Sequence, residues 1–110
     1  MKTLKKNFEF KNVLTKGKFY NGKYIELFVL KNKKNNNFIG IAVQKKIAKA
    51  VGRNRIKRLI KENYRLLEIE IKEGYDIVIL WKKNIHADVA SFNIIREDML
   101  KLFERADLYN

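Results

Sequence analysis

The segment of residues 45–65 constrains the fold of this chain more than any other. It holds nine Lys or Arg residues and a single acid, Glu62. At ~100° per residue, the apolar side chains in and just beyond it share an arc of roughly 140° on a helix; they are Ile56, Leu59, Ile60, Tyr64 and Leu67. The pattern predicts a helix that packs on a core through one face. Its other side is basic, and the natural partner of such a surface is a polyanion.

Positive charge is concentrated in two segments. The formal net charge is +13, residues 1–23 carry seven lysines against one acid, and the excess in residues 45–65 is larger still. Two local basic fields indicate a nucleic acid or an anionic membrane as the partner. Membrane binding needs apolar anchors opposite the charge that are not committed to a core. The distribution therefore favours a nucleic acid.

The composition indicates one folded domain over residues 1–110. The hydrophobic fraction of 46% is too high for a basic disordered tail. Cysteine is absent, which excludes disulfides and thiolate metal sites and is compatible with a cytoplasmic location. The longest apolar run, residues 77–81, is far below the ~18 residues of a membrane-spanning helix. No apolar signal region follows the N-terminus, so we expect neither export nor membrane insertion.

Local patterns predict the elements around the basic helix. Asn7 is expected to cap a helix over residues 8–16 that Gly17 ends. Alternating apolar residues predict strands over residues 24–31 and 38–44, joined as a hairpin by the polar stretch between them. Gly74 allows a turn into a buried strand at residues 75–81.

A last helix is expected to start at Ser91 as its N-cap, with apolar residues at helical spacing after it. The order of helix, hairpin, helix, strand, helix predicts an α+β fold. We expect a single-domain sandwich of a roughly four-stranded sheet with three helices, containing a split βαβ unit.

No catalytic constellation is visible in the sequence. His86 is the single histidine, and no paired metal-ligand pattern surrounds it. The acids are scattered as surface charges or caps. If the chain takes part in phosphodiester chemistry, another component must supply the metal site.

The aromatic residues of the first half allow two interpretations. Phe10, Tyr24, Phe28 and Phe38 are either core residues or a floor on which unpaired bases stack. Phe28 is the best candidate for the floor, because it lies opposite the apolar strand face and is expected beside Gly40. The periodicity alone leaves both interpretations open.

Two arginines near the start of the basic helix serve separate contacts. Arg53 and Arg55 are two positions apart, so they point roughly 200° from each other on a helix. They are unable to clamp one phosphate together. Arg53 also falls beside the apolar arc, where a charge must escape to solvent or find a partner.

The motifs of this region resemble the protein subunit of bacterial ribonuclease P. Residues 51–64 read VGRNRIKRLIKENY and residues 45–50 read KKIAKA. The Arg-Asn-Arg core followed by Ile-Lys-Arg-Leu-Ile is distinctive, and the resemblance extends over nearly the whole chain. It implies a βαβ connection through the basic helix with an unusual left-handed crossover. It also implies that the chain binds a large catalytic RNA, with one protein per RNA, in the cytoplasm. The resemblance further implies that this ribonucleoprotein removes the 5′ leader from precursor tRNA, with Mg²⁺ held by the RNA.

The resemblance also implies roles for individual residues. The catalytic RNA would be bound by Lys45, Lys46, Arg53, Asn54, Arg55, Lys57, Arg58, Lys61 and Arg65. A cleft for the single-stranded leader would be lined by Phe10, Leu14 and Phe28.

Two positions depart from the family pattern. Leu14 replaces an aromatic residue common there, which weakens a stacking role. Lys61 stands where Arg is frequent, which keeps the charge but loses bidentate phosphate geometry. The rival interpretation is a non-enzymatic RNA-binding scaffold such as a ribosomal protein, for which charge and fold class would be the same. A DNA-binding regulator fits less well, because no helix-turn-helix pair precedes the basic helix.

Overall fold

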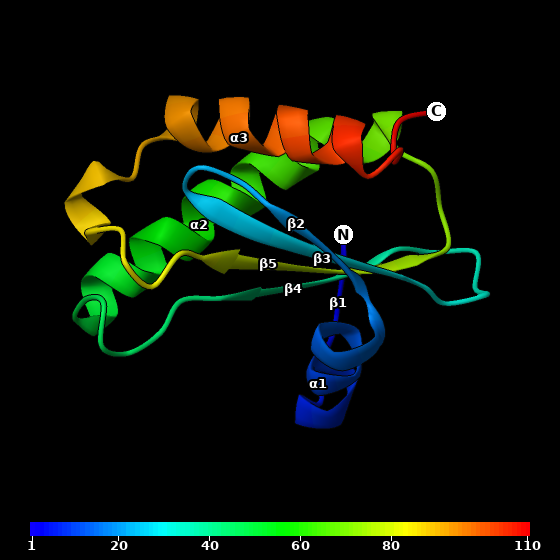
Figure 1. Cartoon of the computed structure of the whole chain (residues 1–110), viewed down its shortest axis with the longest axis horizontal. Coiled ribbons are helices and arrows are strands. Elements are labelled where there is room, and N and C mark those ends of the chain that lie inside the picture. Colours follow the sequence, from blue (N-terminus) through cyan, green and yellow to red (C-terminus); the bar gives the residue numbers. More distant parts are fainter.

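The apolar run of residues 77–81 belongs to the central strand of the sheet. In the computed structural model, which describes residues 1–110, the five strands have the order β1-β4-β5-β3-β2. One helix lies on one side of the sheet and two lie on the other (Figure 1). The strands are β1 Lys2–Thr3, β2 Lys18–Asn21, β3 Ile25–Lys31, β4 Phe38–Ala42 and β5 Tyr75–Trp81. The helices are α1 Asn7–Lys16, α2 Ala50–Leu67 and α3 Phe92–Arg105, with short 3-10 turns at Glu68–Glu70 and Ala87–Val89.

The predicted hairpin between β3 and β4 is wrong, although both strands are present. Both pair with β5 instead, β3 in the antiparallel and β4 in the parallel direction. A strand that is apolar on both faces is most stable where both faces are covered, and β5 takes this central place. Local alternation predicts a strand but not its neighbour, since burial across the whole sheet decides the pairing.

The α+β class is confirmed, with three helices and five strands rather than about four. Two of the strands, β1 and β2, are short strands at the edges of the sheet. Strands β4 and β5 are parallel neighbours joined through α2. No strand separates them, so the expected split βαβ unit is corrected to one with adjacent strands.

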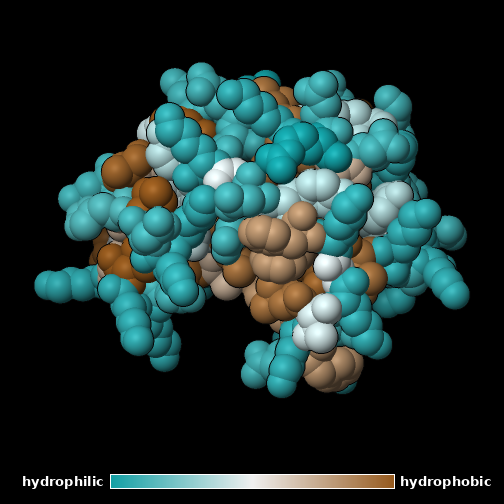
Figure 2. Space-filling view, in the orientation of Figure 1, coloured by the Kyte–Doolittle hydropathy of each residue, from teal (hydrophilic) through white to brown (hydrophobic).

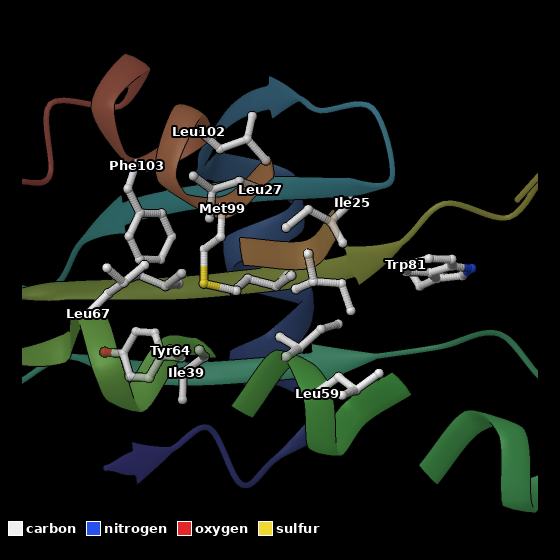
Figure 3. Close-up of a cluster of buried hydrophobic side chains, with 14 of the residues drawn as sticks. Ile25, Leu27, Ile39, Leu59, Tyr64, Leu67, Trp81, Met99, Leu102 and Phe103 are labelled. Atoms are coloured by element: carbon white, nitrogen blue, oxygen red, sulfur yellow. The ribbon is translucent and has the colours of Figure 1, made fainter. Parts of the chain in front are cut away.

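Helices α2 and α3 cover one face of the sheet and enclose the main core (Figure 3). The predicted apolar face of α2 is confirmed, because Ile56 and Ile60 are fully buried and Tyr64 is 1% exposed. The Tyr64 ring meets the edge of Phe103 of α3 at a centroid distance of 6.4 Å. The strands contribute Ile25, Leu27, Ile39, Ile77 and Ile79. Burial of this stripe fixes which side of α2 remains for solvent.

Helix α1 lies on the opposite face of the sheet. The strand pairing places Phe28, Val78 and Gly40 in one row on this face. Gly40 lies beneath Phe10 of α1, since a Cβ atom there would lie 2.6 Å from Cε2 of the ring. Val13 of the same helix is fully buried. The small residue in β4 therefore lets α1 approach the sheet closely.

The helix ends follow the predicted signals with one correction. Gly17 ends α1, and Ser91 caps α3 by accepting a hydrogen bond from the third amide of that helix at 3.4 Å. Asn7, predicted as the cap of α1, is instead its first residue. The Glu9 carboxylate reaches back and accepts from the Lys6 amide at 2.9 Å, so a first-turn acid satisfies the free backbone donor. This backbone hydrogen bond is the main cause that lowers the pKa of Glu9.

Tyr64 brings a hydroxyl group into the core without a partner. Burial raises the pKa of Tyr64 to about 12, and the charge of Glu68 acts in the same direction. The hydroxyl oxygen has no hydrogen-bond partner. The amide of Asn37 opposes the shift, but it already donates to the carbonyl of Lys72 and accepts from the amide of Tyr75. The folded state therefore holds Tyr64 as the neutral phenol.

This burial predicts that Tyr64 contributes to a loss of stability at alkaline pH. The folded pKa lies above the ~10 of an unfolded tyrosine, so the stabilisation is complete below pH ~10 and is lost as the pH rises towards about 12. We expect wild type to lose about 2 to 3 kcal/mol of unfolding free energy over this window relative to Tyr64→Phe. Urea unfolding of both proteins across this pH range measures the difference. Parallel curves for the two proteins would contradict the assignment.

Candidate nucleic-acid interface

The solvent-facing side of α2 is a stripe of polar and basic side chains. Asn54, Arg58, Lys61 and Arg65 are all exposed and recur three or four positions apart, and Arg55 lies beside them. The stripe extends about 16 Å at 1.5 Å per residue. Only Arg58 has an acidic neighbour, with its Nε 3.9 Å from Oε1 of Glu62 in an exposed pair of little energetic weight. The stripe therefore presents charge that the protein itself does not neutralise.

Arg53 lies apart from this stripe. Its side chain is half-buried, and Nη1 donates a hydrogen bond to the carbonyl oxygen of Ala48 at 2.7 Å. The charge of Arg53 was expected either to escape to solvent or to find a partner, and the structure shows the second outcome. The structure thus gives Arg53 an internal contact, to the segment that leads into α2, rather than a place among the exposed cations.

The remaining predicted RNA-binding lysines lie on either side of the stripe. Lys45 and Lys46 are exposed in the connection between β4 and α2. Lys57 is half-buried and, with Lys61, faces the side of the molecule on which α1 lies. The basic surface therefore continues from α2 towards α1.

A hollow opens between α1, the sheet and the loops that follow β4 and β5 (Figure 2). Its cavity volume is about 630 Å³. Phe10 and Leu14 of α1 form one apolar wall, and Ala42 and Leu80 lie on the sheet side. Polar groups complete it: Glu26, Gln44, Lys82, Lys83 and Asn84, together with Trp81.

A smaller hollow of about 280 Å³ adjoins the other side of the Phe10 ring. Its apolar lining includes Leu4 and Gly40, and its cationic lining is Lys57 and Lys61 of α2. Phe10 lines both hollows, so they lie next to each other on either side of its ring, between the end of β5 and the basic helix. We call the two hollows together the α1–α2 cleft.

Phe28 does not line the α1–α2 cleft. It lies on the correct face of the sheet, but β5 separates it from β4, so Val78 stands between Phe28 and Gly40. The expectation that Phe28 lies beside Gly40 is wrong for the same reason as the hairpin. Its ring packs against Phe19 at a centroid distance of 5.0 Å.

The other two aromatic residues also have partners within the protein. The ring of Tyr24 stacks on Trp81 with 6.3 Å between centroids. Phe38 lies under Nζ of Lys34, 4.9 Å from the ring centroid. Of the four aromatic candidates, Phe10 alone lines the cleft.

Three residues of the cleft were not predicted from the sequence. Lys82, Lys83 and Asn84 follow β5 directly and rim the larger hollow. The sequence shows two lysines directly after the predicted buried strand. It does not show that the end of this strand lies near α1. Nζ of Lys82 is engaged, since it donates to the carbonyl of Gly22 at 2.8 Å.

The acidic side chains and the single histidine do not form a cluster of metal ligands. No group of three or more His, Cys, Asp or Glu side chains is placed to hold a metal ion. His86 is paired only with Asp88, at 3.5 Å from Nδ1 to Oδ2, in an exposed position. None of the helices combines the length and the apolar character needed to cross a bilayer.

Comparison with known proteins agrees with the motifs. The family model for ribonuclease P matches residues 1–107. The ribonuclease P protein component of Clostridioides difficile (strain 630) is 42% identical over 108 residues, covering 97% of this chain and 93% of the relative. That of Clostridium botulinum (strain Loch Maree) is 39% identical and covers 97% and 96%.

Solved structures show the same architecture. The RNase P protein of Staphylococcus aureus matches with a TM-score of 0.87 at 27% identity, covering 100% of this chain and 99% of that one. The RNase P protein of Thermotoga maritima matches with a TM-score of 0.83 at 29% identity, covering 96% and 97%. Family model, curated relatives and fold all agree, and the chain belongs to the ribonuclease P protein family, the protein component of a ribonucleoprotein endoribonuclease that processes precursor tRNA.

Proposed function

We propose that the α2 stripe and the adjoining segment with Lys45 and Lys46 bind the catalytic RNA of ribonuclease P. The support is the run of exposed cations along α2, of which only Arg58 has an acidic neighbour. Phosphate contacts from such a rigid surface hold a large RNA in one orientation without reading its bases. Arg53 contributes indirectly, by holding the segment around Ala48 against α2.

We further propose that the α1–α2 cleft binds the single-stranded 5′ leader of the substrate. One observation carries this assignment: the hollow beside Phe10 and Leu14 adjoins a second hollow, which is lined by Lys57 and Lys61 of the basic helix. Bases stack on apolar and aromatic walls while phosphates meet lysines, which is how single strands are held without sequence preference. Phe28 packs against Phe19 of β2 and lies outside these two hollows, so its contact with the leader stays a prediction.

The cleft assignment predicts a gain of affinity from one substitution. Leu14→Phe adds a ring to the cleft wall, and stacking is worth roughly 1 to 3 kcal/mol per base. We expect the holoenzyme to bind precursor tRNA about tenfold more tightly, with the affinity for mature tRNA unchanged. Phe10→Ala should act in the opposite direction. Equilibrium binding of both tRNAs to the reconstituted holoenzyme measures these effects.

The matched control is Ile69→Phe, which adds the same ring at a position that is 85% exposed and outside the cleft. It should leave both affinities unchanged. If Leu14→Phe tightens precursor and mature tRNA equally, the cleft contacts the body of the tRNA, and the leader assignment is wrong.

The chemistry of cleavage is assigned to the RNA subunit. We propose that Mg²⁺ is held by that RNA, with one protein bound to each RNA in the cytoplasm. The support is the basic, groove-lined surface of this chain, which is suited to binding and positioning RNA. Within the holoenzyme, the residues of this chain then hold the leader in place while the RNA carries the reacting phosphate.

A further inference from the structure

The side of α1 that faces away from the cleft carries a stripe of polar and basic residues with one aromatic residue. Packing against the core does not explain this stripe. Its residues recur at one face of the helix: Phe8, Lys11, Asn12, Thr15 and Lys16. Phe8 is 67% exposed. Nζ of Lys6 lies 5.7 Å from the centroid of its ring. The ring has no role in the core, which α1 reaches through Phe10 and Val13 instead.

These residues line a groove of their own. It has a cavity volume of about 560 Å³, close to that of the larger cleft hollow, and its other members are Glu9 and Asp76 of β5. We call it the Phe8 groove. Helix α1 thus separates two grooves, with Phe10 and Leu14 facing one and Phe8 and Lys11 facing the other.

The Phe8 groove holds two lysines and two carboxylates, so its net charge is close to zero, but its lysines are free to contact an anion. Neither Lys11 nor Lys16 takes part in an ion pair. Its two acids are already engaged within the protein: Glu9 accepts from the Lys6 amide at 2.9 Å, and Asp76 accepts from the side chain of Asn32 at 2.9 Å. Free lysines beside an exposed ring offer a single-stranded nucleic acid both phosphate contacts and a stacking platform.

The N-terminal end of α1 connects the two grooves. Phe8 and Phe10 are two positions apart and point roughly 200° from each other, so they flank the same helix end. Lys5 and Lys6, both exposed, precede the helix there. At the other end, Gly17 is pressed against the sheet, since a Cβ atom there would lie 3.2 Å from the carbonyl oxygen of Val29. A strand that runs from the cleft to the Phe8 groove would therefore pass the N-terminal end of α1.

We propose that the Phe8 groove binds the upstream part of a long 5′ leader, as single-stranded RNA that has passed from the α1–α2 cleft around the start of α1. Phe8 stacks on a base, and Lys11 and Lys16 contact phosphates. The inference rests on the proposed leader-binding function of the cleft. It adds that long leaders are held at two places on this protein and short leaders at one.

The test compares two precursor tRNAs, one with a leader of about 4 nucleotides and one with a leader of about 16 nucleotides. These lengths are the lower and upper ends of the range that single-strand binding surfaces cover. Both are titrated against holoenzyme containing wild type, Phe8→Ala, Phe8→Trp or Lys11→Ala. The expected result is that Phe8→Ala weakens binding of the long-leader substrate about tenfold and leaves the short-leader substrate unchanged. Phe8→Trp should retain the wild-type affinity. Ile69→Ala and Lys101→Ala, both at exposed positions elsewhere, are the matched controls.

The outcomes separate the two proposals. If the wild type binds short-leader and leaderless tRNA equally, the cleft assignment fails. If it discriminates between these but Phe8→Ala binds the long-leader substrate like wild type, the cleft stands and the Phe8 groove is overturned. Equal weakening of all substrates by Phe8→Ala, or weakened binding to the catalytic RNA alone, would also overturn it, because Phe8 would then contact a different part of the assembly.

Discussion

Replacing Arg55, Arg58 and Arg65 together by alanine is expected to weaken binding of this protein to the catalytic RNA by about 100-fold or more. Each charge-assisted contact from an ordered helix contributes about 1.5 to 3 kcal/mol, and exposure to solvent reduces the sum. All three side chains are exposed, and the only ion pair lost is that of Arg58 with Glu62. The fold should therefore remain intact.

The salt dependence of binding identifies the mechanism. Losing three phosphate contacts should reduce the slope of log affinity against log salt by about two to three. A control protein with alanine at Lys31, Lys33 and Lys101 loses the same charge from exposed positions outside the α2 stripe. If the control weakens binding as much as the α2 variant, the interaction depends on total charge, and the stripe has no special role.

Asp98→Ala is expected to destabilise the fold by about 3 kcal/mol, because it removes an acceptor shared by three backbone amides. Asp98 of α3 is 7% exposed. Its carboxylate accepts hydrogen bonds from three successive backbone amides in the turn between β2 and β3: those of Lys23 at 2.9 Å, Tyr24 at 2.7 Å and Ile25 at 2.9 Å. Alanine leaves the amides of the half-buried Tyr24 and the buried Ile25 without this acceptor.

Urea unfolding of the variant and wild type measures this loss. Asp98→Asn keeps the shape of the side chain but only one acceptor oxygen, so its destabilisation should be intermediate. Glu97→Ala, at the exposed neighbouring position, is the control and should change stability by less than about 0.5 kcal/mol. An Asp98→Ala protein as stable as wild type would show that the turn keeps its shape without the carboxylate.

The sequence predicted those parts of the fold that depend on local patterns. The apolar arc of α2 and the alternation of β3 and β4 each belong to one segment, and each forms where it was expected. The Ser91 cap is also a local signal and is confirmed. What local patterns do not contain is the choice of partner for a strand. The hairpin was wrong because β5, some 35 residues beyond β4, takes the central place between the two strands.

The candidate site followed the same division. The cations along α2 were predictable, because burial of one helix face leaves the other exposed. The position of Phe28 was not, since it depends on the order of the strands. For Arg53 the sequence left two outcomes open, escape to solvent or a partner, and the partner that it has, the carbonyl of Ala48, depends on how the preceding loop folds back. The Phe8 groove was not predictable either, because it depends on where α1 lies on the sheet.

Cleavage of precursor tRNA by a cognate catalytic RNA at low Mg²⁺, with and without this protein, tests the central claim most directly. The protein should make cleavage at the 5′ end of the mature tRNA possible at Mg²⁺ levels where the RNA alone is nearly inactive. Its cations supply part of the screening that the RNA and the substrate otherwise take from metal ions. Unchanged cleavage in the presence of protein that binds the RNA would contradict the account, because the chain would then be an RNA-binding scaffold without a part in processing.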